Sequence, residues 1–242
     1  MNRALAAAAS GMSAEEQRLD VIADNLANAD VAGFKSSVMT SLAVSDGEHG
    51  FGTVVVGKNP VWRQGKLAKS GGPFDVAIDG TGFFALRRAD GTRIYTRDGE
   101  FSRSADGLVR NAAGAVLEGV HIPANALRVS VATDGKVLVD TPSVQHVKAG
   151  RISLTVFPAP QNLLRTPDGA YLATHAAGRG FALLPGSGQS GRLMFGMLER
   201  SNVNVMESMM EILSAQRAFE ANSKGVQAAD EMLRIANNIQ RS

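Results

Sequence analysis

Seven-residue hydrophobic repeats occur at both ends of the chain and nowhere between them. Near the start, the repeat occupies two lattices three positions apart, Leu5, Met12, Leu19 and Leu26 on one and Ala8, Ile22 and Ala29 on the other. Near the end, the repeat comprises Val205, Ile212, Phe219, Val226 and Leu233. Repeats of this length place an apolar seam on a helix that packs against another helix with a left-handed supercoil. The two ends of the chain are therefore predicted to form helices that pair with each other.

The residues between the repeats are typical of short strands joined by tight turns. Asp-Gly pairs, which take the positive φ of hairpin turns with little strain, recur through this region. They are Asp79-Gly80, Asp90-Gly91, Asp98-Gly99, Asp106-Gly107, Asp134-Gly135 and Asp168-Gly169. We predict a positive φ for the glycine of each of the first five pairs. The predicted fold class is α+β, in which the N- and C-terminal helices pair as a coiled-coil-like helical domain with an inserted antiparallel β-rich domain.

Four segments follow from these patterns. Residues 1–34 are predicted to hold the N-terminal helix, and 35–74 an extended connection with one strand over 51–56. Residues 75–198 are predicted to form the β-rich domain, and 199–242 the C-terminal helix. A C-terminal helix of more than thirty residues is far longer than the average of about 11–12, which favours a packed rod over a lone surface helix.

Composition excludes several classes of partner. The 25 basic and 23 acidic residues leave a net charge of +2, too balanced for a nucleic-acid-binding surface. No apolar run approaches the ~20 residues that span a bilayer, so no direct membrane span is expected. The segment 3–9 resembles the start of a signal peptide, but Glu15, Glu16 and Gln17 follow in the same helical register. We expect a retained amphipathic helix rather than a cleaved signal peptide.

No motif predicts catalysis, a cofactor or a metal site. Gly80-Thr81-Gly82 begins like a dinucleotide-binding loop, but Ala85 stands where the third glycine belongs, and a turn between strands is the better interpretation. The four histidines and the Asp-Gly pairs lack the spacing of zinc or calcium ligands. The cluster Met206, Met209 and Met210 has two interpretations, either ordinary helix packing or an adaptable surface. The chain is not predicted to be an enzyme.

Polar residues near the seams complete the predicted assembly interface. Asparagines there either fix register through hydrogen bonds, as a buried polar residue does in a coiled coil, or cap helices. The capping alternative applies to Asn28, Asn202 and Asn204. The predicted interface comprises Leu5, Met12, Leu19, Ile22, Asn25, Leu26, Asn28, Asn202, Val205, Met209, Ile212, Phe219, Asn222, Val226 and Leu233.

Motifs along most of the chain resemble those of a known family. Asp20-Val-Ile-Ala-Asp-Asn-Leu-Ala-Asn-Ala29 with Gly33-Phe34-Lys35 is similar to the N-terminal signature of bacterial flagellar axial proteins of the rod and hook class. The run Ser201-Asn-Val-Asn-Val205 and the segment Gln216-Arg217-Ala218-Phe219-Glu220-Ala221-Asn222-Ser223-Lys224 resemble the basal-body rod proteins in particular. The middle adds Gly65-Lys-Leu, Asp75-Val-Ala-Ile78, Gly82-Phe83-Phe84, Tyr95-Thr-Arg-Asp-Gly99 and Ile122-Pro-Ala-Asn-Ala126.

The resemblance implies a structural, non-catalytic subunit of the flagellar rod. Such subunits polymerise helically with themselves and with other axial proteins into the periplasmic drive shaft that transmits torque from motor to hook. Their terminal helices pair into an inner tube, a β-rich domain lies outside it, and export runs through the flagellar type III apparatus without a cleaved signal peptide. The tail is most similar to distal-rod proteins, yet the connection between Phe34 and Gly65 lacks their long insertion, so proximal and distal rod both stay open.

Two rival interpretations come from other classes. A secreted β-rich binding or adhesin module would need an exposed ligand cleft and a folded monomer with ordered ends. An enzyme on a β scaffold would need titratable groups that converge in one pocket.

Overall fold

The computed structural model describes residues 2–44 and 52–239, which form two compact units. Unit 1 is built from residues 1–29, 36–61 and 203–242, and unit 2 from residues 30–35 and 62–202. The chain thus passes from one unit to the other four times. None of the helices formed by the described residues has a stretch long and apolar enough to cross a membrane.

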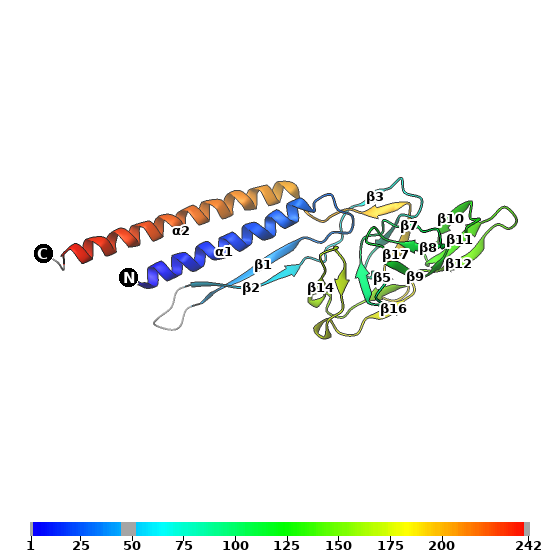
Figure 1. Ribbon diagram of the computed structural model, residues 1–242, viewed down its shortest axis with the longest axis horizontal. Coiled ribbons are helices and arrows are strands. Elements are labelled where there is room, and N and C mark those ends of the chain that lie inside the picture. The colour runs from blue at the N-terminus through cyan, green and yellow to red at the C-terminus, as the bar shows by residue number, and fades with distance from the viewer. Residues whose placement is uncertain (1, 45–51, 240–242) are drawn as a thin grey trace. The chain divides into compact units, whose positions relative to one another are not determined.

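Unit 1 contains the two long helices and a β-hairpin. Helix α1 (Asn2–Ala27) and helix α2 (Val205–Ile239) lie side by side, with the start of α1 and the end of α2 at the same end of the pair (Figure 1). Strands β1 (Ser37–Val44) and β2 (Gly52–Pro60) are antiparallel and pack on α1. A helix at each end of the chain is therefore confirmed.

The hairpin lies within the stretch predicted as an extended connection over residues 35–74. Its second strand includes three consecutive β-branched residues, Val54, Val55 and Val56, which favour a strand. The sequence pattern indicated a strand here but gave it no partner, because residues 37–44 carry no turn signal and no strict alternation. Phe51, at the start of the predicted strand, lies outside the described residues.

Unit 2 is a β-rich body with one large antiparallel sheet and two strand pairs. In the part of the chain described, twelve strands join in the large sheet, whose main path runs β10-β11-β12-β9-β5-β6-β15-β14. Strand β4 pairs with β17 and strand β3 pairs with β18. The bounds are β3 (Leu67–Lys69), β4 (Val76–Asp79), β5 (Phe83–Arg87), β6 (Arg93–Thr96), β7 (Ser102–Arg103), β8 (Leu108–Arg110), β9 (Val116–His121), β10 (Arg128–Val131), β11 (Lys136–Asp140), β12 (Val147–Arg151), β13 (Leu154–Val156), β14 (Leu164–Arg165), β15 (Tyr171–Leu172), β16 (Phe181–Leu183), β17 (Arg192–Phe195) and β18 (Met197–Glu199), with 3-10 turns at Pro160–Asn162 and His175–Ala177.

Two apolar clusters form the interior of unit 2. The larger cluster contains side chains from strands throughout the body, among them the fully buried Ile78, Phe84 and Leu193. The smaller cluster is aromatic, and the single tryptophan, Trp62, packs against its edge. The Trp62 ring lies 5.0 Å from the Tyr171 ring between centroids, so the indole reports on the packing of unit 2.

The Asp-Gly turns are as predicted with one exception. Gly80, Gly91, Gly107 and Gly135 have positive φ. The prediction for Gly99 is wrong, because its φ is not positive. This position needs glycine because an added Cβ would lie 1.7 Å from the carbonyl oxygen of Val76.

Candidate functional site

A buried ionic cluster, here called the Glu199 cluster, lies inside unit 2 and consists of Lys35, Arg63, Gly65, Arg97, Glu199 and Asn202. Lys35 Nζ donates to Glu199 Oε1 at 2.5 Å, and both side chains are fully buried. The Gly65 N–H donates to the same oxygen at 2.8 Å. The Arg97 guanidinium lies 3.5 Å from Glu199 Oε2 and is 5% exposed. One carboxylate therefore serves two buried cations and a backbone donor.

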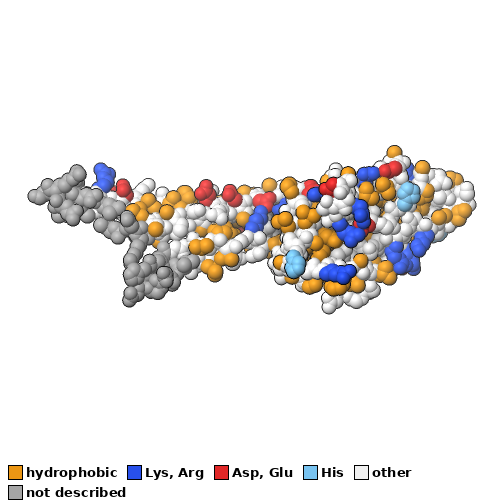
Figure 2. Space-filling model, turned by 60° about the horizontal axis from the view of Figure 1, so that its bottom comes forward, with side chains coloured by type: hydrophobic (Ala, Val, Ile, Leu, Met, Phe, Trp, Pro, Cys, Tyr) orange, Lys and Arg blue, Asp and Glu red, His pale blue; other side chains and the backbone are white. Residues whose placement is uncertain are grey.

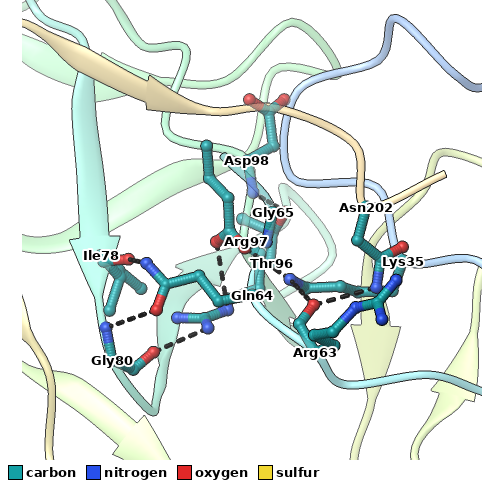
Figure 3. Close-up of polar contacts among 11 residues, drawn as sticks. Lys35, Arg63, Gln64, Gly65, Ile78, Gly80, Thr96, Arg97, Asp98 and Asn202 are labelled. Carbon is teal, nitrogen blue, oxygen red and sulfur yellow. Dashed lines mark hydrogen bonds and ion pairs between the residues drawn. The ribbon is translucent and has the colours of Figure 1, made fainter. Parts of the chain in front are cut away.

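The cluster also binds chain segments that lead toward unit 1. Lys35 Nζ and Asn202 Nδ2 both donate to the Arg63 carbonyl oxygen, at 3.0 and 2.9 Å (Figure 3). The Gly33 N–H donates to the Glu199 carbonyl oxygen at 2.7 Å. Segments 30–35, 62–65 and 199–202, which are far apart in the sequence, are thus tied to one another at the places where the chain leaves unit 2.

Arg97 extends the network toward the β4–β5 turn. Its Nη2 donates to the Gly80 carbonyl oxygen at 2.7 Å. Gln64 bridges the same turn, accepting from the Gly80 N–H at 3.0 Å and donating to the Ile78 carbonyl oxygen at 3.1 Å (Figure 3). Backbone groups that the turn leaves without strand partners are satisfied in this way.

Burial dominates the electrostatics of the cluster. It lowers the pKa of Lys35, and the Glu199 carboxylate opposes that shift. It lowers the pKa of Arg97 as well, again opposed by Glu199. Charges enclosed in this way are stable only with their partners in place. The arrangement serves the packing of the chain itself, since the carboxylate and the ammonium have no exposed surface on which to meet a ligand.

Asp98, next to Arg97, has a carboxyl group whose pKa is strongly raised. Burial raises its pKa to about 6, and the neighbouring charges of Glu100 and Asp75 act in the same direction. A hydrogen bond from the Glu100 N–H, at 3.0 Å, opposes the shift.

In unit 1, three polar contacts fix the hairpin to α1. Asn25 exchanges two hydrogen bonds with the backbone of Ser37, both 2.8 Å long, and is 7% exposed. Near the other end of the helix, Ser10 Oγ accepts from the Thr53 N–H at 3.2 Å. Lys58 Nζ also forms an ion pair with Asp24 at 2.6 Å. No sequence pattern predicts these contacts, because the strand residues contribute mainly backbone groups.

The residues of the predicted assembly interface fall into different environments. Ile22 and Asn25 are buried, and Val205 and Met209 are exposed. Asn202 lies in unit 2, and the side chain of Leu233 lies outside the part of the chain described. The remaining members are half-buried on the two helices or, for Asn28, just after the end of α1, namely Leu5, Met12, Leu19, Leu26, Asn28, Ile212, Phe219, Asn222 and Val226.

Two of the asparagines, Asn28 and Asn204, make local hydrogen bonds within the chain. Asn28 Nδ2 donates to the Asp24 carbonyl oxygen at 2.7 Å. Asn204 Oδ1 accepts from the N–H groups of Met206 and Glu207 and so caps α2. Asn222 lies near α1 at Gly11, where an added Cβ would be 2.8 Å from Asn222 Nδ2. A glycine in mid-helix thus permits close approach of the helices.

The most buried residues of α2 were missed by the hydrophobic repeat. Ser208 and Ala215, seven residues apart, are 6% and 0% exposed. Small residues let helix backbones approach closely, so apolar size did not identify this line. Their seven-residue spacing was the available signal.

No group of three or more His, Asp or Glu residues within 2–44 and 52–239 is placed to hold a metal ion. The described residues form a unit of two helices and a hairpin and a β-rich unit whose buried charges bind segments of the chain to one another.

Comparisons with known proteins show the family of the chain. Three family profiles match: "Flagella basal body rod protein" over residues 5–35, "Flagellar hook protein FlgE/F/G D1 domain" over 77–139, and "Flagellar basal body rod FlgEFG protein C-terminal" over 195–239. The chain is 34% identical to the flagellar basal-body rod protein FlgG of Borreliella burgdorferi and 31% identical to that of Bacillus subtilis, over 100% of each chain. It is 30% identical to the rod protein FlgF of Caulobacter vibrioides, over 98% of this chain and 97% of that one.

The chain belongs to the flagellar basal-body rod protein family. It is a structural subunit of the rod and not an enzyme. The adhesin alternative has no support among these relatives.

Proposed function

We propose that copies of this chain, with other flagellar axial proteins, polymerise helically through unit 1 into a shaft that carries torque along the rod. The observation that carries this proposal is a methionine-rich stripe on α2, formed by Met206, Met209, Met210 and Leu213. These side chains are between 50% and 70% exposed. Large apolar side chains gathered on the surface of a folded chain mark an interaction site. Flexible thioethers also adapt to neighbours that are not identical.

The hairpin supports the same proposal. Val38, Leu42, Val54 and Val56 are each at least half exposed. Figure 2 shows hydrophobic side chains along the surface of the helical and hairpin part. Apolar surface on two elements of one unit suits a subunit that meets more than one neighbour. A contact that does not close on itself generates a helical filament.

Coiled-coil-like pairing of α1 and α2 into an inner tube is part of this proposal. It is supported by the contact between the helices, by the close approach at Gly11 and by the seven-residue spacing of Ser208 and Ala215. The predicted interface residues then divide into two roles. Val205 and Met209 would meet a neighbour directly, whereas the buried and half-buried members would hold the helices that present the surface.

We also propose that the rod formed by this chain lies in the periplasm and that the flagellar type III apparatus exports the subunit. The named relatives are basal-body rod proteins, and the N-terminal and C-terminal motifs resemble those of exported axial proteins.

The test is assembly of the purified protein over a range of concentrations, followed by light scattering and electron microscopy. Wild type is expected to show helical order only above a threshold concentration. Met210→Asp should raise that threshold at least tenfold, because a charge would be buried at the contact, and should leave the circular dichroism of the dilute protein unchanged.

Gln227→Asp is the matched control, since it places the same charge at an exposed position on α2 that lies fourteen residues beyond Leu213, the last residue of the stripe. It should assemble as wild type does. Assembly of Met210→Asp at the wild-type threshold would contradict the proposed role of the stripe, and a wild type without helical order at any concentration would contradict self-assembly.

A further inference from the structure

The carboxyl-terminal strands complete the interior of unit 2. Strand β4 contributes Val76, Ala77 and Ile78 to the core, all at most 2% exposed, and its only strand partner within the described residues is β17. Strand β17 in turn contributes the fully buried Leu193. Without residues 192–199, the backbone of β4 would lack its ladder hydrogen bonds in the middle of the core.

Further bonds of the same carboxyl-terminal segment reach other early parts of unit 2. The Gly191 N–H donates to the Thr81 carbonyl oxygen at 2.7 Å, and the Gly196 N–H donates to the Asp75 carbonyl oxygen at 2.8 Å. The Arg200 N–H donates to the Lys66 carbonyl oxygen at 2.9 Å. A segment of about ten residues therefore closes several loops that are more than a hundred residues long.

The buried charges of unit 2 also require a carboxyl-terminal residue, Glu199. Both ion pairs of the buried cations Lys35 and Arg97 within the described residues go to Glu199. Lys35 precedes Glu199 by 164 residues. Until Glu199 is in place, a closed body would enclose two cations with no anion, which costs several kcal/mol per ion.

We propose that unit 2 stays open while the chain emerges from the ribosome with its amino terminus first. The unit closes only when β17 and β18 have emerged, and Glu199 is the closing residue. Most of the chain must therefore be available before the body can form. Because unit 2 cannot be completed early, the emerging polypeptide remains unfolded until nearly its full length has left the ribosome.

The experiment uses the full chain followed by a flexible linker of variable length and a translational arrest peptide. Linker length then sets how many carboxyl-terminal residues remain inside the ribosome exit tunnel. Resistance of unit 2 to brief proteolysis is expected to begin only when Glu199 has left the tunnel. Resistance at lengths that expose residues up to 190 but keep 192–199 inside would overturn the proposal.

A second measurement isolates Glu199 in the released protein. Native-state hydrogen exchange of the β3 and β4 amides should be roughly 1,000-fold faster in Glu199→Gln than in wild type, because the open form becomes more populated. Glu118→Gln is the matched control, since Glu118 lies on the surface of the same body and pairs with Arg87 and Arg93. Its exchange should match wild type, and equal exchange in the two variants would refute the closing role of Glu199.

Discussion

Glu199 should matter more to the stability of unit 2 than either cation it binds. Glu199→Gln keeps an acceptor for the Gly65 N–H but leaves Lys35 and Arg97 buried without an anion. Removing one member of a buried ion pair costs about 3–5 kcal/mol. Because two cations lose their partner at once, we expect a loss near the upper end, about 4–5 kcal/mol. Lys35→Met leaves Glu199 with Arg97 and the Gly65 N–H, so its loss should be near the lower end, about 3 kcal/mol.

Urea unfolding followed by Trp62 fluorescence measures both losses, because the indole packs in unit 2. With a slope of about 2 kcal/mol per molar urea, Glu199→Gln should move the midpoint down by roughly 2 M. In the double variant, the combined loss should fall short of the sum by about 2 kcal/mol, because the two residues contact each other. If Lys35→Met lost as much unfolding free energy as Glu199→Gln or more, the assignment of Glu199 as the shared partner would be refuted. Strictly additive losses in the double variant would refute it as well.

The pH dependence of Glu199→Gln provides an internal check. Burial already lowers the pKa of Lys35 from its ordinary value near 10.5, and loss of the opposing carboxylate should lower it further. A lysine with a lowered pKa in the folded protein binds its proton less tightly there than in the unfolded chain, so stability rises with pH between the two pKa values. The difference in the free energy of unfolding between wild type and Glu199→Gln should therefore become smaller as pH rises from 7 toward 10.

Three other changes test separate parts of the structure. Asp98→Asn should stabilise unit 2 by about 1 kcal/mol at pH 7 in urea unfolding, and the gain should vanish below pH 4. The raised pKa of about 6 favours the protonated Asp98 carboxyl in the folded state. The stability that this carboxyl contributes is therefore fully present below about pH 4 and is lost as pH rises through 6. Gly99→Ala should cost roughly 3 kcal/mol in the same assay because its Cβ would meet the Val76 carbonyl oxygen, whereas Gly71→Ala, with open space at the Cβ, should be near neutral. Asn25→Ala should speed amide exchange in β1 and β2 and cost unit 1 about 2–3 kcal/mol, because it leaves a buried N–H and C=O of β1 without partners.

The terminal helices could be predicted because a helix repeats its environment every few residues. The repeat that begins at Leu5 and the one that begins at Val205 are local patterns, and the structure has a helix at each. The face of α2 that contacts α1 was harder to predict. Ser208 and Ala215 are its most buried residues, and a search for large apolar side chains passes over them.

The Glu199 cluster could not be predicted from the sequence, although four of the quoted motifs contribute to it. Lys35 ends the Gly33-Phe34-Lys35 motif, Gly65 begins the Gly65-Lys-Leu motif, and Arg97 lies in the Tyr95 to Gly99 motif. Asn202 lies in the Ser201 to Val205 run, which begins two residues after Glu199. An isolated lysine, arginine or glutamate in a sequence is usually a surface residue. Nothing in the spacing of these residues indicates that a β body of more than a hundred residues folds to bring them together.

The distribution of apolar side chains in unit 1 bears on whether the folded chain stays a monomer or assembles with further copies. The line of α2 at Ser208 and Ala215 is buried against the rest of the unit, while the methionine-rich stripe at Met206, Met209, Met210 and Leu213 faces outward. Full burial of such a side chain is worth about 1.5–3 kcal/mol, so a neighbour that covered all four would gain at most about 6–12 kcal/mol. Association costs an estimated 4–15 kcal/mol, so one such contact barely offsets the cost of bringing two chains together. A subunit that adds to a helical polymer meets several neighbours and loses its translational and rotational freedom once. The same stripe that would hold a dimer weakly therefore suffices for a filament when the hairpin face, with Val38, Leu42, Val54 and Val56, is covered in the same step.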